Sequence, residues 1–294
     1  MIKDSIITIG TFDGLHKGHQ YLLSNLISLS KALSFRPVVL TIPMPARFYL
    51  DPKNFLGSLT TPLEKMKLLK EWIKSSEFLD FKEIKNIEAK EFVEDYLIKK
   101  YNMKAIIVGH DFRFGKGRKG DFDFLLSNSL GRYKVFRAKE HRINGKRISS
   151  SKIRILIKSG KIEEANFLLG RRYFINGVVS EGMKLARKIG FPTANVTFDP
   201  YKIVPTFGVY WVKTRVDEIE YDSIGYISQR EKNGRIYNNL EVHIFNFNRN
   251  IYSKPVSIGF ERFLRPPIKF SNIDEAKIQI KKDIKKLKNE IFGI

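Results

Sequence analysis

The stretch TIGTFDGLHKGH, residues 8–19, decides the fold of the first half of this chain. It overlaps a short apolar run, Ser5–Gly10, that is typical of a buried strand, and it leads into a helix pattern from Gly18 onward. Gly10 and Gly14 allow the backbone to turn sharply and to approach a ligand closely. Free N–H groups at the start of a helix favour phosphate. The stretch therefore predicts a strand, a phosphate-binding turn and a helix in succession.

Two histidines give this turn its candidate chemistry. His16 and His19 are three positions apart, so a tight turn brings both imidazoles to one spot, and the whole chain holds only five histidines. Two imidazoles beside a helix N-terminus are donors suited to charge that develops on a triphosphate. Taken alone, the pair is also compatible with a loop of solvent-exposed histidines, and a metal site would need a third ligand.

Outward from this turn, strand and helix patterns alternate through the first half. Apolar runs predict strands at residues 37–42 and 105–108, and we expect a helix at about residues 91–101. The stretch TPLE, residues 61–64, reads as a helix start with an N-cap threonine and a capping-box glutamate. This alternation indicates a parallel sheet with helices on both faces, whose ligands lie beyond the carboxyl ends of the strands.

The pattern changes after about residue 170. Strand-like stretches separated by turns follow at residues 173–179, 208–216, 240–247 and 256–264. They predict a compact antiparallel sheet or barrel. Residues 272–292 predict a final helix, because their apolar side chains recur every three or four positions on one face and lysines occupy the other. We therefore expect two domains, residues 1–168 and 169–294.

Composition limits the class of protein. The chain has 294 residues, and 43% of them are hydrophobic, which excludes a disordered chain. Cysteine is absent, which excludes a disulfide scaffold, a cysteine-ligated zinc site and a cysteine nucleophile. No apolar run approaches the ~20 residues that span a bilayer, and the N-terminus lacks the layout of a signal peptide. We therefore expect a cytoplasmic protein with no membrane partner.

The net charge of +22 is the one anomaly in the composition. Its 53 Lys and Arg against 31 Asp and Glu suggest nucleic acid or another polyanion as partner. No helix-turn-helix, OB or RRM signature occurs, and the basic residues are spread along the chain, most densely on the final helix. A basic nucleic-acid-binding protein on a nucleotidyltransferase-like scaffold is thus only the remote alternative.

Four further segments carry candidate site residues. VGHDFRFGKGRKGD, residues 108–121, gathers basic residues around four glycines and is either an anion-binding loop or a solvated tip. RISSSKIR, residues 147–154, can cap a helix and direct hydroxyl groups at phosphate. GFPTAN, residues 190–195, reads as a proline-led turn, and LEVHIFNF, residues 240–247, places Glu241 and His243 on the polar face of a strand.

Together these segments resemble the bacterial bifunctional riboflavin kinase/FAD synthetases. The first stretch resembles the H-x-G-H signature of the nucleotidylyltransferase superfamily, RISSSKIR the S-S-T-x-I-R segment, GFPTAN the P-T-A-N motif and LEVH the segment of the kinase glutamate. The resemblance implies an α/β chain with an N-terminal Rossmann-like domain containing a parallel sheet, and a small C-terminal antiparallel β-barrel with a terminal helix. It also implies phosphorylation of riboflavin to FMN and adenylylation of FMN to FAD, both with ATP.

The resemblance further implies roles for particular residues. In the first domain, His16 and His19 would be catalytic. ATP would contact Gly10, Phe12, Gly18, Ser149, Ser150 and Arg154. Candidates for binding flavin or phosphate are Asp111, Phe112, Arg113, Arg118 and Arg265. In the second domain, Glu241 would be the general base that takes the proton of the riboflavin 5′-hydroxyl, and Thr193 and Asn195 would hold Mg²⁺ with the ATP phosphates.

The sequence departs from the family pattern in several places. An Asp-Pro-His-Pro-like stretch is TIPMP here, residues 41–45, and an N-I-G-x-x-P-T-F-like segment is GYISQREKNGR, residues 225–235. A Gly-Arg pair is Ala186-Arg187, and Pro267 stands where an R-x-E-x-x-F-like stretch has its glutamate. These departures leave open an FAD synthetase whose second domain is a degenerate, non-catalytic kinase. A homo-oligomer is also left open.

Overall fold

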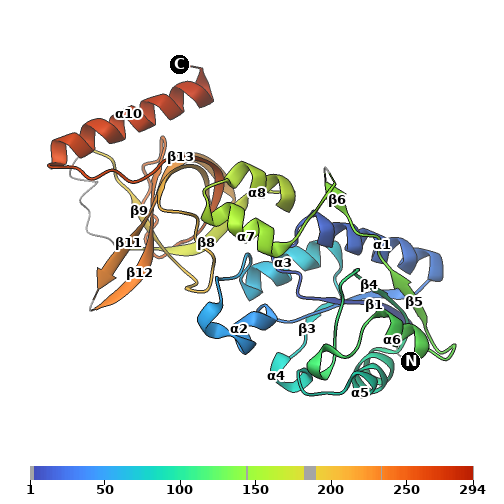
Figure 1. Cartoon of the computed structure of the whole chain (residues 1–294). Coiled ribbons are helices and arrows are strands. Elements are labelled where there is room, and N and C mark those ends of the chain that lie inside the picture. The colour runs from blue at the N-terminus through green and yellow to red at the C-terminus, as the bar shows by residue number, and fades with distance from the viewer. Residues whose placement is uncertain (1–2, 144, 182–189, 233, 294) are drawn as a thin grey trace. The chain divides into compact units, whose positions relative to one another are not determined.

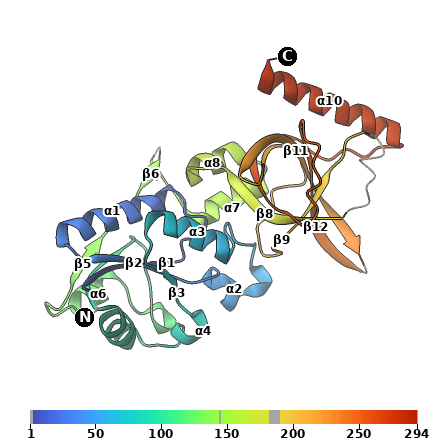
Figure 2. The same ribbon diagram turned by 180° about the vertical axis from the view of Figure 1, so that it is seen from behind.

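The computed structural model describes residues 3–143, 145–181, 190–232 and 234–293. The chain divides into two compact units, Met1–Ile153 and Arg154–Ile294 (Figure 1). The first unit holds an open sheet with helices, and the second holds a closed barrel, as the view from behind also shows (Figure 2). Ala186 and Arg187 lie outside the described residues.

The first unit is built on a five-stranded parallel sheet in the order β3-β2-β1-β4-β5. Its strands are β1 (Ser5–Gly10), β2 (Arg36–Thr41), β3 (Ser76–Phe78), β4 (Met103–Val108) and β5 (Lys134–Arg137). The strand at Ser5–Gly10 is confirmed residue for residue, and the two other predicted strands are confirmed with small shifts at their ends. Parallel strands place all their carboxyl ends at one edge, which is where a site forms.

Helices cover both faces of this sheet, as the sequence predicts. Successive strand residues point to opposite faces. Ile7 and Ile106 pack with Leu97 in one apolar cluster, while Ile6 packs with Leu26 in another, and all are fully buried. Side chains of α5 (Ala89–Glu91), the π-helix η2 (Phe92–Lys100) and α6 (Phe122–Ser127) pack in the first cluster. Side chains of α1 (Lys17–Leu33) and α3 (Pro62–Trp72) pack in the second.

The start of α3 confirms the predicted capping box. The Glu64 N–H donates to Thr61 Oγ1 at 3.3 Å, and the Thr61 N–H donates to Glu64 Oε2 at 2.9 Å. These two bonds satisfy backbone donors that the helix itself leaves unpaired. Shorter elements complete the first unit: α2 (Ala46–Leu50), η1 (Pro52–Asn54), α4 (Phe81–Ile84), η3 (Lys116–Arg118), β6 (Arg142–Ile143) and β7 (Lys146–Arg147).

The second unit is a closed antiparallel barrel in the order β10-β11-β12-β9-β8-β13, which confirms the expected fold class. Its strands are β8 (Tyr173–Ser180), β9 (Ala194–Phe198), β10 (Gly208–Val216), β11 (Ile219–Lys232), β12 (Arg235–Ile244) and β13 (Pro255–Arg265). Helix α7 (Ser150–Lys158) runs across the boundary between the units, and α8 (Ile162–Leu169) follows it.

The sequence pattern did not predict β9 and β11, and it placed the start of β12 at residue 240, five residues after its actual start at Arg235. The outer parts of β11 and β12 form a hairpin that protrudes from the barrel (Figure 1). Ile236 and Tyr237 in this hairpin are 69% and 43% exposed. The hairpin therefore lacks the alternation of buried apolar and exposed polar side chains that marks a strand in a sequence. Pairing of the backbones, which leaves no mark in the sequence, holds these residues in strands.

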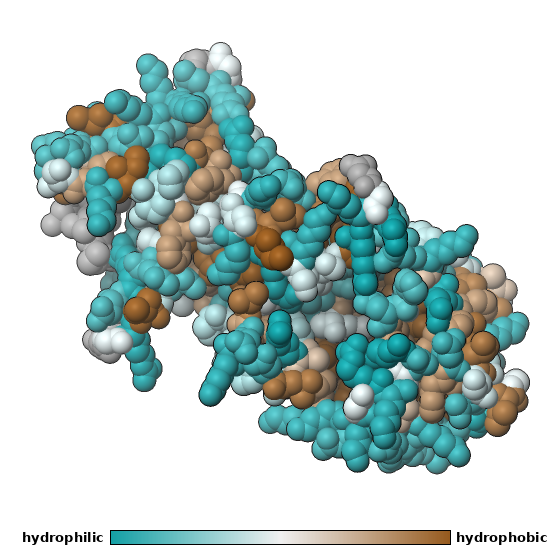
Figure 3. All heavy atoms as spheres, viewed as in Figure 1, coloured by the Kyte–Doolittle hydropathy of each residue, from teal (hydrophilic) through white to brown (hydrophobic). Residues whose placement is uncertain are grey.

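The final helix α10 (Ile273–Phe292) begins after the N-cap Asn272, whose Oδ1 accepts from the Glu275 N–H at 2.9 Å. Ile284 and Leu287 are buried against Val209 of the barrel, so the expected apolar face packs along its middle. Ile273 is 53% exposed, and the first turn of that face therefore lies outside the core. Figure 3 shows hydrophilic residues over most of the visible surface of this helix.

Among the residues that the structure describes, no helix is both long enough and apolar enough to cross a membrane.

Candidate active site

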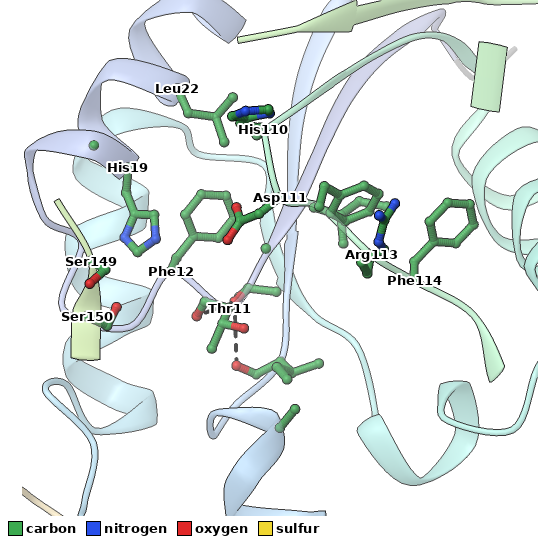
Figure 4. Close-up of a pocket in the computed structure, with 18 of the residues that line it drawn as sticks. Thr11, Phe12, His19, Leu22, His110, Asp111, Arg113, Phe114, Ser149 and Ser150 are labelled. Carbon is green, nitrogen blue, oxygen red and sulfur yellow. Dashed lines mark hydrogen bonds between the residues drawn. The ribbon is translucent and has the colours of Figure 1, made fainter. Parts of the chain in front are cut away.

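A cavity of about 800 Å³ opens beyond the carboxyl ends of β1, β2 and β4 (Figure 4). Its lining includes eleven of the residues singled out in the sequence: Gly10, Phe12, His16, Gly18, His19, Asp111, Phe112, Arg113, Arg118, Ser149 and Ser150. Figure 4 shows His19, Ser149 and Ser150 on one side, with Arg113 and Phe114 on the other. Arg154 lies farther along α7 and is not among the lining residues.

The two histidines of the turn are held together. Their rings stack with 3.7 Å between centroids and 13° between planes. His16 is the N-cap of α1, and its Nδ1 accepts the His19 N–H at 3.3 Å. A nitrogen that accepts a hydrogen bond carries no proton, so in this arrangement the imidazole proton of His16 sits on Nε2. A Cβ at Gly18 would stand 3.2 Å from the His16 ring, which explains the glycine there.

Phe12 shapes the floor of the cavity. It is 1% exposed, its backbone φ is +47°, and its ring meets His19 edge to face with centroids 5.3 Å apart. A Cβ at Gly10 would stand 3.0 Å from the Phe12 ring. Gly10 therefore serves close packing of this ring as well as the turn that the sequence suggests.

A buried carboxylate anchors the turn. Asp13 is 1% exposed and accepts from the backbone N–H groups of Leu59 and Thr60, each at 3.1 Å. The Asp13 carbonyl accepts from Ser150 Oγ at 2.8 Å. One residue thus joins three segments around the cavity. Sequence reasoning missed it, although an acidic residue between apolar neighbours in a glycine turn is a usable signal.

The serine segment caps α7 as expected. Ser149 Oγ accepts from the Lys152 N–H at 3.3 Å. The hydroxyl of Ser150 is committed to Asp13, and Ser151 also lines the cavity. The start of this helix therefore faces the cavity with backbone N–H groups, which favour an anion.

The loop of residues 109–121 forms part of the wall of the cavity. Arg113 forms an ion pair with Asp121, whose Oδ1 also accepts from the Phe124 N–H at 2.8 Å. Arg118 lines the cavity and makes no ion pair with another described residue. Residues 116–119 are exposed, and Arg113 and Arg118 line the cavity, so an anion-binding loop stays a prediction.

The two phenylalanines of this loop have different surroundings. Their rings stack with 5.4 Å between centroids. Both line the cavity, but Phe114 is 8% exposed and packs against Phe92 of the core, whereas Phe112 is only half-buried. Phe112 is thus the better placed of the two to contact a flat ring.

Several lining residues escaped the sequence analysis. Arg147 pairs with Asp111 and lies 3.4 Å from Glu140. Burial would raise the pKa of Asp111, but the hydrogen bond and charge of Arg147 outweigh it, and the pKa is lowered. His110 and His141 also line the cavity, so four of the five histidines of the chain do. Because the chain has so few histidines, each of them was a candidate site residue, and this could have identified His110 and His141 from the sequence.

A second polar group lies on the outer face of the barrel. Leu240 and Val242 of β12 point inward and are buried, so Glu241 and His243 point outward. Glu241 is the cross-strand partner of Asn195 on β9, and its Oε2 lies 3.5 Å from Thr193 Oγ1. The structure thus brings the three predicted residues of the second site together.

Three further contacts hold this group. Glu241 Oε1 accepts from Arg230, with which it forms an ion pair, and from Asn239 Nδ2 at 2.9 Å. His243 Nδ1 donates to the Pro192 carbonyl at 2.8 Å. Sequence reasoning missed Arg230, because it lies in a continuous polar run, Ser228–Lys232, that does not distinguish it from its neighbours. Among the described residues, no cluster of three or more His, Cys, Asp and Glu that could hold a metal occurs.

Arg265 lies at the end of β13 and contacts the final helix. Its Nη2 donates to Asp283 Oδ2 at 2.6 Å, its Nε donates to the same carboxylate, and both side chains are largely buried. Gln279 Nε2 also donates to Asp283, at 2.8 Å. Pro267 lies in the exposed segment between this strand and α10.

The stacked histidine turn at the carboxyl edge of a 3-2-1-4-5 parallel sheet places the first unit among the nucleotidylyltransferases of the H-x-G-H type. A family model described as FAD synthetase matches residues 1–152, and one described as riboflavin kinase matches residues 169–291. The chain therefore belongs to the bifunctional riboflavin kinase/FMN adenylyltransferase family of transferases. The presence of both domains favours the bifunctional interpretation over a degenerate second half.

Similar proteins cover nearly the whole chain. A bifunctional riboflavin kinase/FMN adenylyltransferase from Buchnera aphidicola is 37% identical over 97% of this chain and 94% of its own length. Proteins with the same description from Haemophilus influenzae and Bacillus subtilis are 33% and 32% identical, over 98% and 95% of this chain and 94% and 90% of their own. A crystal structure from Streptococcus pneumoniae, described as a macrolide-efflux protein, has a TM-score of 0.88 at 29% identity, covering 97% of this chain and 94% of its own.

Proposed function

We propose that the chain catalyses two successive transfers from ATP. In the first transfer, the 5′-hydroxyl oxygen of riboflavin bonds to the γ-phosphorus, and FMN and ADP are formed. In the second, a phosphate oxygen of FMN bonds to the α-phosphorus of another ATP, and FAD and pyrophosphate are formed. Residues 1–168 would carry the adenylyl transfer and residues 169–294 the kinase step. The stacked histidine pair inside the cavity is the observation that carries the proposal.

The first site suits a reaction that depends on positioning and charge. Neither transfer needs a covalent enzyme intermediate, because fixed donors can stabilise the charge on the transferring phosphate. His16 donates only from Nε2, since its Nδ1 caps α1, and His19 lies beside it. Both would stabilise the α-phosphate and the departing pyrophosphate. Gly10, Phe12 and Gly18 would shape the ATP site.

The walls of the cavity supply the remaining contacts. Ser149 and Ser150, at the start of α7, would direct backbone N–H groups at the β- and γ-phosphates, with Arg154 one turn further on. Arg113 and Arg118 would neutralise phosphate charge, and Phe112 would contact the flavin ring. These assignments are supported by the placement of the side chains and by the matching segments of the family.

The second site suits a general base and a hard cation. Glu241 would accept the proton of the riboflavin 5′-hydroxyl. Thr193, Asn195 and Glu241 offer oxygen donors only, and Mg²⁺ prefers such donors and completes its shell with water and substrate phosphates. Thr193 and Asn195 would therefore hold Mg²⁺. When bound, the ion would neutralise charge on the phosphate oxygens of ATP.

One chromatographic assay tests both activities. Purified protein with riboflavin, MgCl₂ and ATP should form FMN and then FAD. His19→Ala should slow FAD formation by about 100-fold and still form FMN, whereas Glu241→Ala should lose FMN formation and still convert supplied FMN to FAD. Full FAD formation by His19→Ala would remove the first assignment, and unchanged FMN formation by Glu241→Ala would remove the second.

A further inference from the structure

A fully buried lysine lies behind the wall of the first site. Lys65 belongs to α3, is 0% exposed and is not among the residues that line the cavity. Its Nζ donates to the carbonyl oxygens of Ile42 and Pro43, at 2.9 Å and 3.0 Å. An ammonium group is costly to bury unless hydrogen bonds replace its hydration. These two carbonyls therefore give the lysine side chain a defined place in the fold.

The start of α3 fixes where this side chain begins. The backbone N–H of Lys65 donates to the carbonyl of the N-cap Thr61 at 2.9 Å, within the first turn of the helix. Just before the cap, the N–H groups of Leu59 and Thr60 donate to the Asp13 carboxylate. This stretch of chain is therefore fixed to the histidine turn at one end, and through its lysine it reaches the segment after β2 at the other.

The segment that Lys65 holds has few donors of its own. Residues 42–45 are Ile-Pro-Met-Pro, and none of their side chains carries a hydrogen-bond donor. The two prolines also lack a backbone N–H. Helix α2 begins after Pro45 without a hydrogen bond from a capping side chain. The ammonium group of Lys65 thus supplies donors that this segment lacks.

Ile42 brings this arrangement into the cavity. It is half-buried, lines the cavity and packs on the same apolar cluster as Phe112 and Ile84, which also line it. The His19 ring instead contacts Phe12, which belongs to the cluster on the other face of the sheet. Ile42 therefore lies on the Phe112 side of the cavity, where we place the flavin ring, rather than on the side of the histidine pair.

We propose that Lys65 is a positioning residue for FMN in the adenylyl transfer. By holding the carbonyls of Ile42 and Pro43, it sets the place of the Ile42 side chain, which would contact the flavin ring together with Phe112. The histidine pair is held separately, by the Asp13 anchor and by the cap of α1. Lys65 therefore acts on FMN binding and leaves the transfer step unchanged. This inference rests on the proposed adenylyltransferase function of the first unit.

The test is the steady-state conversion of FMN to FAD by the full chain, with each substrate varied in turn. Lys65→Met keeps the apolar stem and the approximate length of the side chain and removes the ammonium group. It should raise KM for FMN by about tenfold, while kcat and KM for ATP stay within about twofold of wild type. Riboflavin phosphorylation, which we assign to the second unit, should not change.

Two variants of α3 accompany this measurement. Lys67→Met is the matched control, because Lys67 lies in the same helix and is exposed, and it should leave both KM values and kcat unchanged. Lys65→Gln keeps an N–H donor on a shorter side chain. It replaces Lys65→Met if that variant does not fold, and KM for FMN should again rise.

A change on the cavity side tests the same wall without touching the lysine. Ile42→Ala should raise KM for FMN by about fivefold, because apolar contact with the flavin ring is lost. When Ile42→Ala is combined with Lys65→Met, KM for FMN should be no more than about tenfold above wild type, because both changes act through one side chain.

Several results would overturn the inference. Unchanged KM for FMN in the Lys65 variant or in Ile42→Ala would do so, and so would a loss confined to kcat. A double variant whose KM rises by the product of the two single effects would show that Lys65 does not act through Ile42. Wild-type protein that forms no FAD from FMN would remove the adenylyltransferase function itself, whereas an active wild type with any of the other results would remove only the role of Lys65.

Discussion

The rings of His16 and His19 stack 3.7 Å apart, and the His19 N–H donates to Nδ1 of His16. The two nitrogens of this imidazole therefore differ. Nδ1 caps helix α1, so Nε2 carries the proton of the neutral ring. The cap and the proposed chemistry depend on the same side chain, and substitutions can separate them.

Asparagine and alanine at position 16 should give different results. An asparagine oxygen can accept the His19 N–H as Nδ1 does, but it places no donor where Nε2 lies. We expect His16→Asn to slow FAD formation by about 100-fold with little change in stability. His16→Ala should also cost about 1 kcal/mol of unfolding free energy, because the cap is lost. Urea titration and an FMN adenylylation assay measure the two effects, and equal stability of both variants would contradict the capping role.

The buried Asp13 should matter more for stability than an exposed aspartate of the same unit. In Asp13→Asn, an NH₂ group faces one of the backbone N–H donors of Leu59 and Thr60, so a buried donor loses its acceptor. We expect a loss of about 2 kcal/mol of unfolding free energy. Asp123→Asn is the matched control, since the Asp123 side chain is 80% exposed and its loss should cost less than about 0.5 kcal/mol. Similar losses in the two variants would show that the anchor is unimportant.

The pair of Arg265 and Asp283 should tie α10 to the barrel. Their side chains are 18% and 12% exposed, whereas those of the Arg249–Asp217 pair are 49% and 45% exposed. Arg265→Met leaves a shielded carboxylate whose one remaining donor among the described residues is Gln279, and we expect it to cost about 2 kcal/mol. Arg249→Met should cost less than about 1 kcal/mol.

The two tryptophans allow this difference to be measured in the barrel alone. Trp72 lies in the first unit and Trp211 in the second, and the chain has only these two. Urea unfolding in a Trp72→Phe background, followed by fluorescence, therefore reports on Trp211. If Arg265→Met unfolds at the same urea concentration as Arg249→Met, the pair does not hold the helix.

The stability of the barrel should depend on pH through His243. Burial, with the charge of Lys288, lowers the pKa of His243 below its ordinary value of 6.5. The unfolded chain therefore binds more protons than the folded chain between the lowered pKa and 6.5, so stability falls as the pH drops through this window. His243→Gln should weaken that dependence, as urea midpoints between pH 5 and pH 8 would show. A profile identical to wild type would mean that His243 titrates alike in both states.

Much of the fold follows from patterning along the chain. The strand at Ser5–Gly10, the capping box of Thr61 and Glu64, and the final helix were each predictable, because burial and capping leave local marks in the sequence. The exposed hairpin of β11 and β12 was not, because its strands are defined by pairing rather than by burial. Prediction succeeded where the cause of a structure is local.

The candidate sites divide in the same way. Motifs in the sequence located His16, His19, Ser149 and Glu241. The sequence analysis missed Asp13, Arg147 and Arg230, because the role of each is defined by a partner outside its own segment, namely Thr60, Asp111 and Glu241.

The sequence by itself determined the two domain types, the family and the motif residues, since these depend on spacing and periodicity over short stretches. Only the tertiary structure decided which nitrogen of His16 caps α1 and which oxygen of Glu241 faces Thr193. The reason is physical: the role of a polar group is set by the donors and charges that folding brings to it, and those come from segments that the sequence keeps apart.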